Sequence, residues 1–322
     1  MSGSFRKPTK QDEPAPASVQ GLPFSAGVLP VDKPAGIGSY DVIRELTPFF
    51  PGLRLGHTGT LDPAASGLLL VCVGTATRLV SYFHEMPKTY MAEILLGTVT
   101  ETEDLYGKVV ETHPVPDITS DNLEAIYARF TGEIMQRPPA YSALKVGGVR
   151  AYTLARKGEV PELAERRVHI YAITPRRLYQ GGDRLYLDIR CSSGTYIRSL
   201  ARDIGEALGC GACLSGLRRI SIGDYMVEDA YFYSNRNPQE MRERYLDIAA
   251  CLGQERLVTV AGEEARLLSH GIIPRAIAAR LENCSTNYVG FMDAARHIPA
   301  VLRRENGVWR FVCTQSLPVE SA

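Results

Sequence analysis

A single carboxylate, Asp62, stands in the stretch RLGHTGTLDPAASGLLL, residues 54–70, where a turn rich in glycine and threonine leads into an apolar segment. No second acid and no set of metal ligands accompanies it in this stretch. Paired-carboxylate chemistry and metal-assisted hydrolysis need such neighbours, so the pattern favours chemistry that one carboxylate can perform. An isolated Thr-Leu-Asp-Pro run more commonly caps a helix, and this structural alternative stays open.

Two further stretches place aromatic or basic side chains at turns. Tyr90 enters a strand from a lysine-bearing turn in PKTYMAEI, and Tyr196 and Arg198 leave a glycine turn just before a helix in CSSGTYIRSLARDIG. Taken singly, each tyrosine could be an edge aromatic of a sheet, and Arg198 could be a surface helix residue. In the same way, His57 could be a turn residue that the backbone satisfies.

The stretch QRPPAYSALKVGGVRAYTLARKG, residues 136–158, alternates basic side chains with tyrosines. It opens on prolines and is rich in glycine, so it suits a phosphate backbone better than a protein interior. Between residues 137 and 220 the chain carries 15 Lys and Arg against 7 Asp and Glu, although its net charge is zero. The middle of the chain therefore has the charge expected for a polyanion partner.

The elements around these residues predict an α/β (α+β) fold with a mixed, mainly antiparallel sheet. GVLPVDK reads as a strand, followed by a turn and a helix that Ser39 or Asp41 could start. TYMAEILLG and RLYLDIRC alternate as half-buried strands do, and SLARDIGEALGCG reads as a helix that ends at glycine. For SGLLLVCVGTATRL the periodicity cannot decide between a buried strand and a helix.

The composition predicts three parts: a disordered tail at 1–22, a large domain at 23–245 and a smaller one at 246–322. FYSNRNPQEMRERYLDIAACLG, at the second boundary, reads as a connecting helix. TVAGEEARLLSHG then reads as a short helix, and PAVLRRENGVWRFVC as a hairpin around Asn306-Gly307.

Seven cysteines without a secretory leader indicate a reduced, cytoplasmic setting. Cys210-Gly-Ala-Cys213 lacks the second pair that a zinc site needs, so we read it as buried small residues and expect no metal. No apolar stretch approaches the ~20 residues that span a bilayer, so no membrane role is expected.

Seven blocks of this sequence, in their order, resemble the TruB family of pseudouridine synthases, which act on uridine 55 in the T-loop of tRNA. The likeness is close over residues 27 to about 230 and looser over 250–322. It implies a pseudouridine synthase fold with an RNA-binding insertion at about 138–166 and a small PUA-like, RNA-binding β domain at the C-terminus. The blocks are DKPAGIGS, GHTGTLDPAASGLL, GTATRL, KTYMAEILLGTVTETEDLYGKVVE, PPAYSALKVGGVRAYTLARKGE, CSSGTYIRSLARDIGEALG and LRRI.

The resemblance implies that Asp62, Tyr90 and Arg198 are catalytic. Asp62 would attack C1′ or the base, or act as a base toward the ribose. Arg198 would keep this carboxylate ionised in a largely apolar pocket. Tyr90 would stack on the extracted uracil and help to remove the C5 proton.

The other implied site residues bind substrate. Tyr196 and Leu217 would wall the pocket, His57 would stack into the position that the uridine vacates, and Lys33 would order the pocket or contact RNA. Phosphate contacts would come from the insertion. Its contributing residues are Lys145, Arg150, Arg156 and Lys157. The implied partner is the T-arm of tRNA, with no cofactor, metal, membrane or obligatory protein partner, and the implied state is a monomer.

Departures from the family pattern are mild: Gly38 and Ser66 stand where threonine is common, and Arg78 where lysine is common. Thr100, Thr102 and Asp104 match an acidic turn of the family that we interpret as structural, because an acidic turn binds phosphate poorly.

Three rival functions remain. A non-catalytic tRNA-binding or folding protein on the same scaffold would have no need of Asp62, Tyr90 and Arg198. An RNA-guided enzyme within a multi-protein particle usually carries long extensions at both ends. An aspartyl phosphatase would want a second acid and Mg²⁺ ligands near Asp62.

Overall fold

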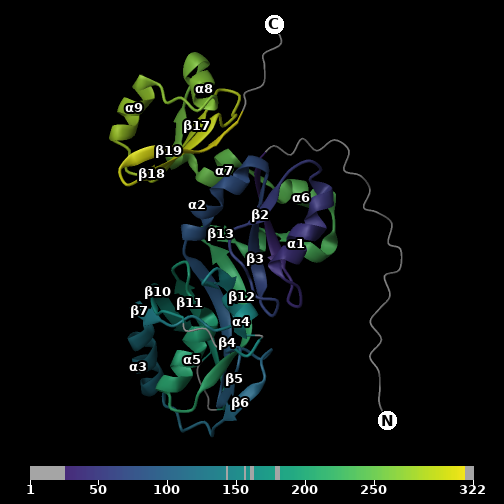
Figure 1. The fold of residues 1–322 in the computed structure, drawn as a ribbon, viewed down its shortest axis with the longest axis vertical. Coiled ribbons are helices and arrows are strands. Elements are labelled where there is room, and N and C mark those ends of the chain that lie inside the picture. Colours follow the sequence, from purple (N-terminus) through teal and green to yellow (C-terminus); the bar gives the residue numbers. More distant parts are fainter. Residues whose placement is uncertain (1–25, 143, 156, 160–162, 178–181, 316–322) are drawn as a thin grey trace, which may run out of the picture.

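The computed structural model describes residues 26–142, 144–155, 157–159, 163–177 and 182–315. The tail predicted at 1–22 lies outside them. Figure 1 shows an elongated molecule with a large sheet along most of its length and a smaller sheet at one end. Within the described residues, no helix is long and apolar enough to cross a bilayer.

The predicted mixed, mainly antiparallel sheet is confirmed. In the described part of the chain its order is β14-β1-β3-β12-β4-β11-β10-β7, with β2 on β3, β13 on β12 and β15 on β1. The pairs β1–β14 and β3–β12 are parallel, and the others are antiparallel. Its strands are β1 (Gly27–Lys33), β2 (Leu55–His57), β3 (Ser66–Val73), β4 (Lys88–Leu96), β7 (Gly132–Gln136), β10 (Arg166–Pro175), β11 (Arg184–Cys191), β12 (Ala212–Ile222), β13 (Tyr225–Met226), β14 (Tyr231–Phe232) and β15 (Leu246–Asp247).

Three smaller sheets and a set of helices complete the described fold. The sheets are β5 (Thr98–Thr100) with β6 (Val109–Thr112), β8 (Lys145–Val146) with β9 (Val149–Arg150), and β16 (Leu257–Thr259), β17 (Tyr288–Met292), β18 (Ala300–Glu305) and β19 (Val308–Thr314). The helices are α1 (Ser39–Leu46), α2 (Val80–Glu85), α3 (Ser120–Phe130), α4 (Ala151–Ala155), α5 (Ile197–Ala207), α6 (Pro238–Arg244), α7 (Ile248–Leu252), α8 (Gly262–Ser269) and α9 (Arg275–Glu282).

The apolar run whose periodicity was ambiguous is β3. Leu68 and Leu70 pack into one buried cluster, while Leu69 and Val71 pack into another on the opposite face. A strand buried on both faces loses its alternation, which is why the sequence alone could not separate it from a buried helix. This strand carries the chain directly out of the Asp62 loop.

At Gly67, β3 lies too close to β12 for any side chain. The backbone has φ +103°, and an added Cβ would lie 2.2 Å from the Arg219 carbonyl oxygen. We therefore expect Gly67→Ala to destabilise the fold by about 2 kcal/mol or more, because backbone strain and steric overlap add. Urea unfolding measures this loss. Gly52→Ala is the control, since Gly52 also has positive φ but an added Cβ would contact nothing, and equal losses in the two variants would contradict the crowding argument.

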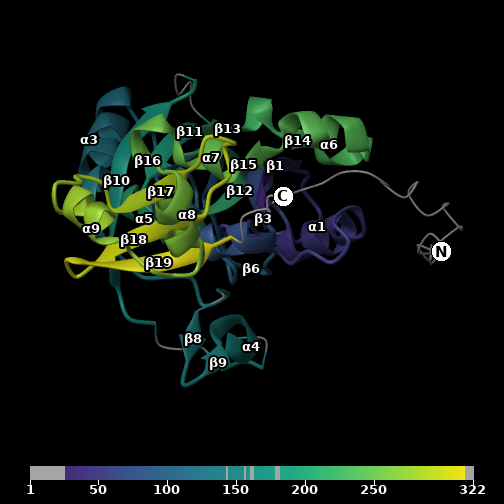
Figure 2. The ribbon, with the colours of Figure 1, turned by 90° about the horizontal axis from the view of Figure 1, so that it is seen from above.

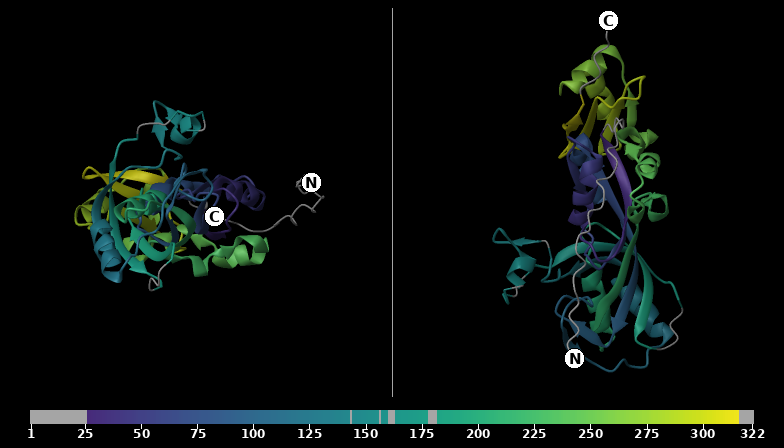
Figure 3. Two further views of the ribbon diagram at one scale, coloured as in Figure 1. Left: turned by 90° about the horizontal axis from the view of Figure 1, so that it is seen from below. Right: turned by 90° about the vertical axis from the view of Figure 1, so that its right-hand side faces the viewer.

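The insertion projects from the body of the molecule, as Figures 2 and 3 show for β8, β9 and α4. It leaves the end of β7 and returns at β10, the two edge-side strands of the large sheet. Gly147 and Gly148 both have positive φ and close the β8–β9 hairpin. This placement leaves the β8–β9 turn and β9 exposed, while Ala151 and Ala155 of α4 are buried.

The predicted C-terminal hairpin is present as β18 and β19, with φ of 50° at Asn306 and 80° at Gly307. The predicted connecting helix is wrong: the chain breaks into α6 and α7, because Leu246–Asp247 pairs with β1 between them. Strand β15 therefore lies in the large sheet, just beyond the boundary predicted at 246. The division into domains remains a proposal.

The two larger sheets share one buried cluster. Val28 and Leu70 of the large sheet lie in it together with Tyr288, Val301 and Cys313 of the smaller sheet. The ring of Tyr82, on α2, meets the Tyr288 ring edge-on with centroids 4.9 Å apart. The smaller sheet is thus packed directly against the larger one.

Candidate active site

The Asp62 loop is fixed to the start of α1. The Ser39 hydroxyl donates to the Leu61 carbonyl oxygen at 3.0 Å and accepts the Leu61 N–H at 2.8 Å. The Gly36 N–H donates to the Pro63 carbonyl oxygen at 2.7 Å. After Pro63 the chain turns into β3, so the interpretation of Asp62 as a helix cap is wrong.

Arg198 pairs with Asp62. Its Nε lies 2.9 Å from Asp62 Oδ2, and its side chain is 6% exposed against 40% for the carboxylate. The Nε–H does not point at a hydrogen-bond acceptor, so the contact is an ion pair. The other two guanidinium nitrogens donate to the carbonyl oxygens of Thr102 at 2.9 Å and Tyr141 at 3.0 Å. The arginine is therefore held in place by two backbone groups from distant segments.

The acidic turn at residues 100–107 packs against the Arg198 guanidinium. Asp104 Oδ2 lies 3.7 Å from Arg198 Nε. Asp104 Oδ1 accepts from the Thr102 hydroxyl at 2.5 Å and from the Tyr106 N–H at 3.0 Å. The Thr100 hydroxyl donates to the Asp104 carbonyl oxygen at 2.6 Å. These contacts fit the predicted structural role and add a second carboxylate near the guanidinium.

Glu103 of the same turn was not singled out from the sequence. It accepts a hydrogen bond from Ser199 at 2.9 Å and pairs with Arg202. Burial raises the pKa of Glu103, and Arg202 opposes that rise. Helix α5 thus directs Arg198, Ser199 and Arg202 toward the turn at 100–107. Their spacing along the helix, which places them on one side of it, could have suggested this arrangement.

Tyr90 lies on β4, opposite Ile189 of β11 and Arg219 of β12. It is half-buried. Burial raises the pKa of the Tyr90 phenol, while the Arg219 guanidinium lowers it. The phenol therefore stays protonated at neutral pH.

Arg219 is a buried cation that the sequence reasoning missed. It is 2% exposed, and it donates to the Leu68 carbonyl oxygen at 2.7 Å and the Gly59 carbonyl oxygen at 3.1 Å. It thereby connects β12 to both ends of the Asp62 loop. The LRRI block contains this residue, but carbonyl partners leave no pattern in a sequence.

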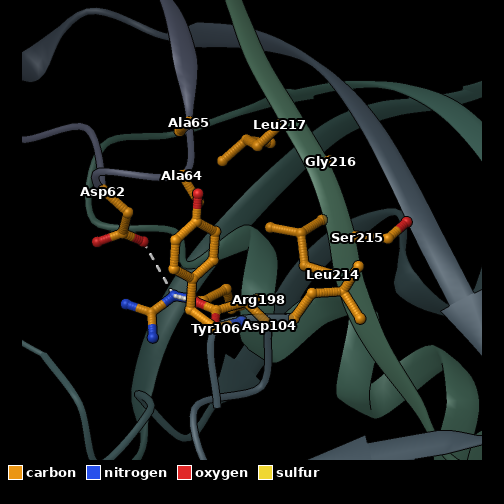
Figure 4. A pocket seen from close by; sticks show the side chains of 11 residues that line it. Asp62, Ala64, Ala65, Asp104, Tyr106, Arg198, Leu214, Ser215, Gly216 and Leu217 are labelled. Carbon is orange, nitrogen blue, oxygen red and sulfur yellow. Dashed lines mark hydrogen bonds and ion pairs between the residues drawn. The ribbon is translucent and has the colours of Figure 1, made fainter. Parts of the chain in front are cut away.

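A pocket brings together Asp62, Arg198 and Leu217 of the predicted residues (Figure 4). Tyr90, Tyr196, His57 and Lys33 do not line it. Its cavity volume is about 20 Å³. The lining residues are Asp62, Ala64, Ala65, Asp104, Leu105, Tyr106, Arg198, Leu214, Ser215, Gly216 and Leu217.

Two of the remaining predicted residues lie on elements next to the pocket. Tyr196 caps α5; its N–H donates to Gln136 Oε1 at 2.9 Å, and Arg166 stacks on its ring at 4.5 Å. His57 ends β2 with a buried Nδ1 that has no partner among the described residues. Burial, and after it Arg219, lowers the pKa of His57. A neutral ring suits the stacking that we predicted for it.

Lys33 is fully buried. Its Nζ donates to the Pro34 carbonyl oxygen at 2.8 Å and to the Ile37 carbonyl oxygen at 2.7 Å. These contacts hold the turn that leads into α1. Because Gly36 of this turn donates to the Pro63 carbonyl oxygen, they also help to hold the Asp62 loop. Of the two roles predicted for Lys33, ordering the pocket agrees with this burial, and a contact with RNA does not.

The buried ammonium of Lys33 gives a pH dependence of stability. Burial, and after it Arg219, lowers the pKa of Lys33 from 10.5 to about 8. Between these values the folded chain has lost a proton that the unfolded chain keeps, so the unfolding free energy rises with pH, by up to about 1.4 kcal/mol per unit. We expect Lys33→Met to lose this rise. Urea unfolding of the wild type and of Lys33→Met at pH 7.5 and 9.5 measures this rise in the unfolding free energy. Lys88, whose pKa is also lowered to about 8, contributes equally to the pH dependence of both proteins. Parallel pH profiles would contradict the assignment.

The predicted phosphate contacts lie on the projecting insertion. Arg150 is exposed in β9, with its guanidinium 6.0 Å from the centre of the Tyr152 ring, and Lys157 is exposed after α4. Lys145 lies in β8, but its side chain is not among those described, and Arg156 lies outside the described residues.

Comparison with protein families and curated proteins gives matches over most of the chain. The family described as "TruB family pseudouridylate synthase (N terminal domain)" matches residues 49–197, and "tRNA pseudouridylate synthase B C-terminal domain" matches 198–245. Proteins named tRNA pseudouridine synthase B are similar to the chain. That of Clostridium acetobutylicum is 40% identical over 76% of this chain and 84% of its own length, and that of Chromohalobacter salexigens is 41% identical over 86% and 90%.

Solved structures share the fold. A chain of the "archaeal box H/ACA sRNP Nop10-Cbf5 complex" superposes with a TM-score of 0.62 at 20% identity, covering 90% of this chain and 85% of that one. A chain of an "H/ACA RNP bound to a substrate RNA containing 2'-deoxyuridine" gives 0.60 at 22%, covering 86% and 77%.

Proposed function

The chain belongs to the TruB family of pseudouridylate synthases and forms pseudouridine in tRNA, and from this premise we propose that its target is uridine 55 of the T-loop. The observation that carries the proposal is the Asp62–Arg198 pair in a pocket beside β12 of the large sheet. The pair supplies one carboxylate, held by a cation that is itself fixed by the Thr102 and Tyr141 carbonyl groups.

The reaction exchanges one glycosidic bond for another. The N1–C1′ bond breaks, the uracil turns over, and a C5–C1′ bond forms; the C5 proton leaves and N1 gains a proton, so atoms and charge balance without a cofactor. Asp62 acts as the nucleophile toward C1′ or the base, or as a base toward the ribose. Arg198 holds the carboxylate toward the base through their ion pair.

Tyr90 stacks on the extracted uracil. Its position on β4 beside the Asp62 loop and its half-buried ring support this role. The raised pKa of its phenol favours stacking and proton donation over the direct removal of a proton at neutral pH.

RNA binding combines shape with phosphate contacts. Arg150 and Lys157 of the projecting insertion, together with Lys145 and Arg156, neutralise phosphates of the T-stem, so binding weakens steeply with salt. His57 fills the position that the uridine vacates, and Tyr196 and Leu217 wall the base. The C-terminal β sheet is a PUA-like domain that contacts RNA.

The chain works as a monomer in the cytoplasm without an obligatory protein partner. Its identity to the curated tRNA enzymes is about twice that to the chains from the H/ACA particles, and this favours the stand-alone mode. Activity of the purified chain alone tests this.

The decisive experiment incubates the purified protein with unmodified tRNA tritiated at C5 of uridine and maps the product by mass spectrometry of T-loop fragments. We expect tritium release without any added cofactor and one pseudouridine at position 55. Release from another position would contradict the proposed target. No release, with tRNA binding retained, would favour the alternative function of a tRNA-binding or folding protein.

A further inference from the structure

The pocket opens to solvent on one side, yet its free space is smaller than the base that it has to receive. Its free volume, about 20 Å³, holds one or two water molecules, whereas uracil has eight non-hydrogen atoms. A lining group must therefore move before the uracil can enter. This argument rests on the proposed function, because it takes uracil as the occupant.

Most of the lining is fixed. Asp62 and Arg198 hold each other, and Arg198 is tied to two carbonyl groups. Leu214, Ser215, Gly216 and Leu217 belong to β12, which lies inside the large sheet between β3 and β4. Ala64 and Ala65 have no side-chain rotation that could open space.

Tyr106 is different. It lines the pocket and yet is 70% exposed, against 47% for its neighbour Leu105, so its ring is the largest exposed group between the pocket and solvent. Figure 4 shows this ring among the lining side chains, beside the Asp62–Arg198 pair. Within the described residues, its hydroxyl has no hydrogen-bond partner.

The backbone beneath this ring is held firmly. The Tyr106 N–H donates to Asp104 Oδ1 at 3.0 Å, and the Leu105 N–H donates to the Leu214 carbonyl oxygen at 3.2 Å. An added Cβ on Gly107 would lie 2.3 Å from the Thr102 hydroxyl, so this end of the turn is tightly packed. A free ring on a fixed backbone moves by side-chain rotation alone, which for an exposed residue takes picoseconds to nanoseconds.

We infer that Tyr106 is the gate of the uridine pocket: its ring rotates outward to admit the extracted base and then stacks on the face of the base that would otherwise meet solvent. The ring replaces water on that face, so it both excludes solvent and holds the base against Asp62. Tyr106 is thus a residue that positions the substrate, in addition to Tyr90. The hydroxyl group has no part in this role.

Single-turnover kinetics at saturating tRNA test the gate. Stacking of an aromatic ring on a base changes an equilibrium by roughly one to two orders of magnitude. We therefore expect Tyr106→Ala to lower the rate about tenfold or more with little change in tRNA affinity, and Tyr106→Phe to restore it. Tyr106→Leu, which fills space without stacking, should fall between them. The matched control is Phe232→Ala, which removes a 51% exposed aromatic ring from the edge strand β14.

A second measurement separates base positioning from folding and from chemistry. In an Asp62→Asn background, ¹⁹F NMR of a T-arm RNA with 5-fluorouridine at the target position reports the environment of the base. When residue 106 is Tyr or Phe, we expect the ¹⁹F resonance of the bound RNA to shift from that of free RNA. When residue 106 is Ala, we expect the resonance to stay near its position in free RNA. A Tyr106→Ala enzyme as fast as the wild type, or a Phe variant as slow as the Ala variant, would overturn the gate. Absence of pseudouridine with the wild type would contradict the proposed function instead.

Discussion

Asp62→Asn is expected to abolish pseudouridine formation, lowering the single-turnover rate at least about 10³-fold, while tRNA still binds. The amide keeps the size of the carboxylate but cannot act as a nucleophile or base. Since the side chain is 40% exposed and the loop is held by Ser39 and Gly36, the fold should survive the change. Tritium release and filter binding to the same tRNA measure the two effects.

The matched control is Asp188→Asn. Asp188 is also a carboxylate paired with an arginine, Arg176, at 3.3 Å, and its side chain is 42% exposed. It does not line the pocket. We expect this variant to react at the wild-type rate. Activity in Asp62→Asn above a few per cent of the wild type would remove Asp62 from the reaction.

Arg198→Lys is expected to lower the rate about 10²-fold although the positive charge is kept. An ammonium cannot reach Asp62, the Thr102 carbonyl and the Tyr141 carbonyl together, because the guanidinium spans them with three separate nitrogens. The carboxylate then loses its orientation, and a buried carbonyl loses its donor. Single-turnover kinetics with a thermal melt for each variant separates lost orientation from lost stability.

Arg266→Lys serves as its comparison, since Arg266 forms an ion pair with Glu263 on α8 and does not line the pocket. We expect that change to leave the rate within about twofold of the wild type. If Arg198→Lys weakened tRNA binding and spared the rate at saturation, Arg198 would be an RNA contact. If Arg198→Lys reacted at the wild-type rate, a positive charge at residue 198 would suffice for the reaction without the guanidinium geometry.

The sheet was predictable from the sequence because most of its strands alternate. TYMAEILLG and RLYLDIRC became the neighbours β4 and β11, each with one face covered by α3 and α5. The strand at 66–73 was not predictable from the sequence, because burial on both of its faces removes the alternation. The helix predicted across residues 232–253 failed for another reason: Leu246 pairs with Val28, far away in the sequence, and local propensity contains no trace of that partner.

The site was predictable only where the resemblance named its residues. Asp62 and Arg198 belong to segments far apart in the chain, and nothing in their spacing brings them together. Arg219 and Glu103 were missed because their partners are carbonyl oxygens or residues on other elements. Tyr106 was missed because an exposed tyrosine in a turn is common, and only the geometry shows that it lines a pocket.

The core shared between the two larger sheets packs them into one unit. Tyr288, Val301 and Cys313 pack with Val28 and Leu70, and Arg303 pairs with Glu85 at 2.5 Å across the same boundary. The distance from the Asp62 pocket to the smaller sheet is therefore set by packing. If the smaller sheet contacts RNA as proposed, an RNA that binds both must have matching dimensions, and the protein would then select RNAs by length before any base leaves its stack.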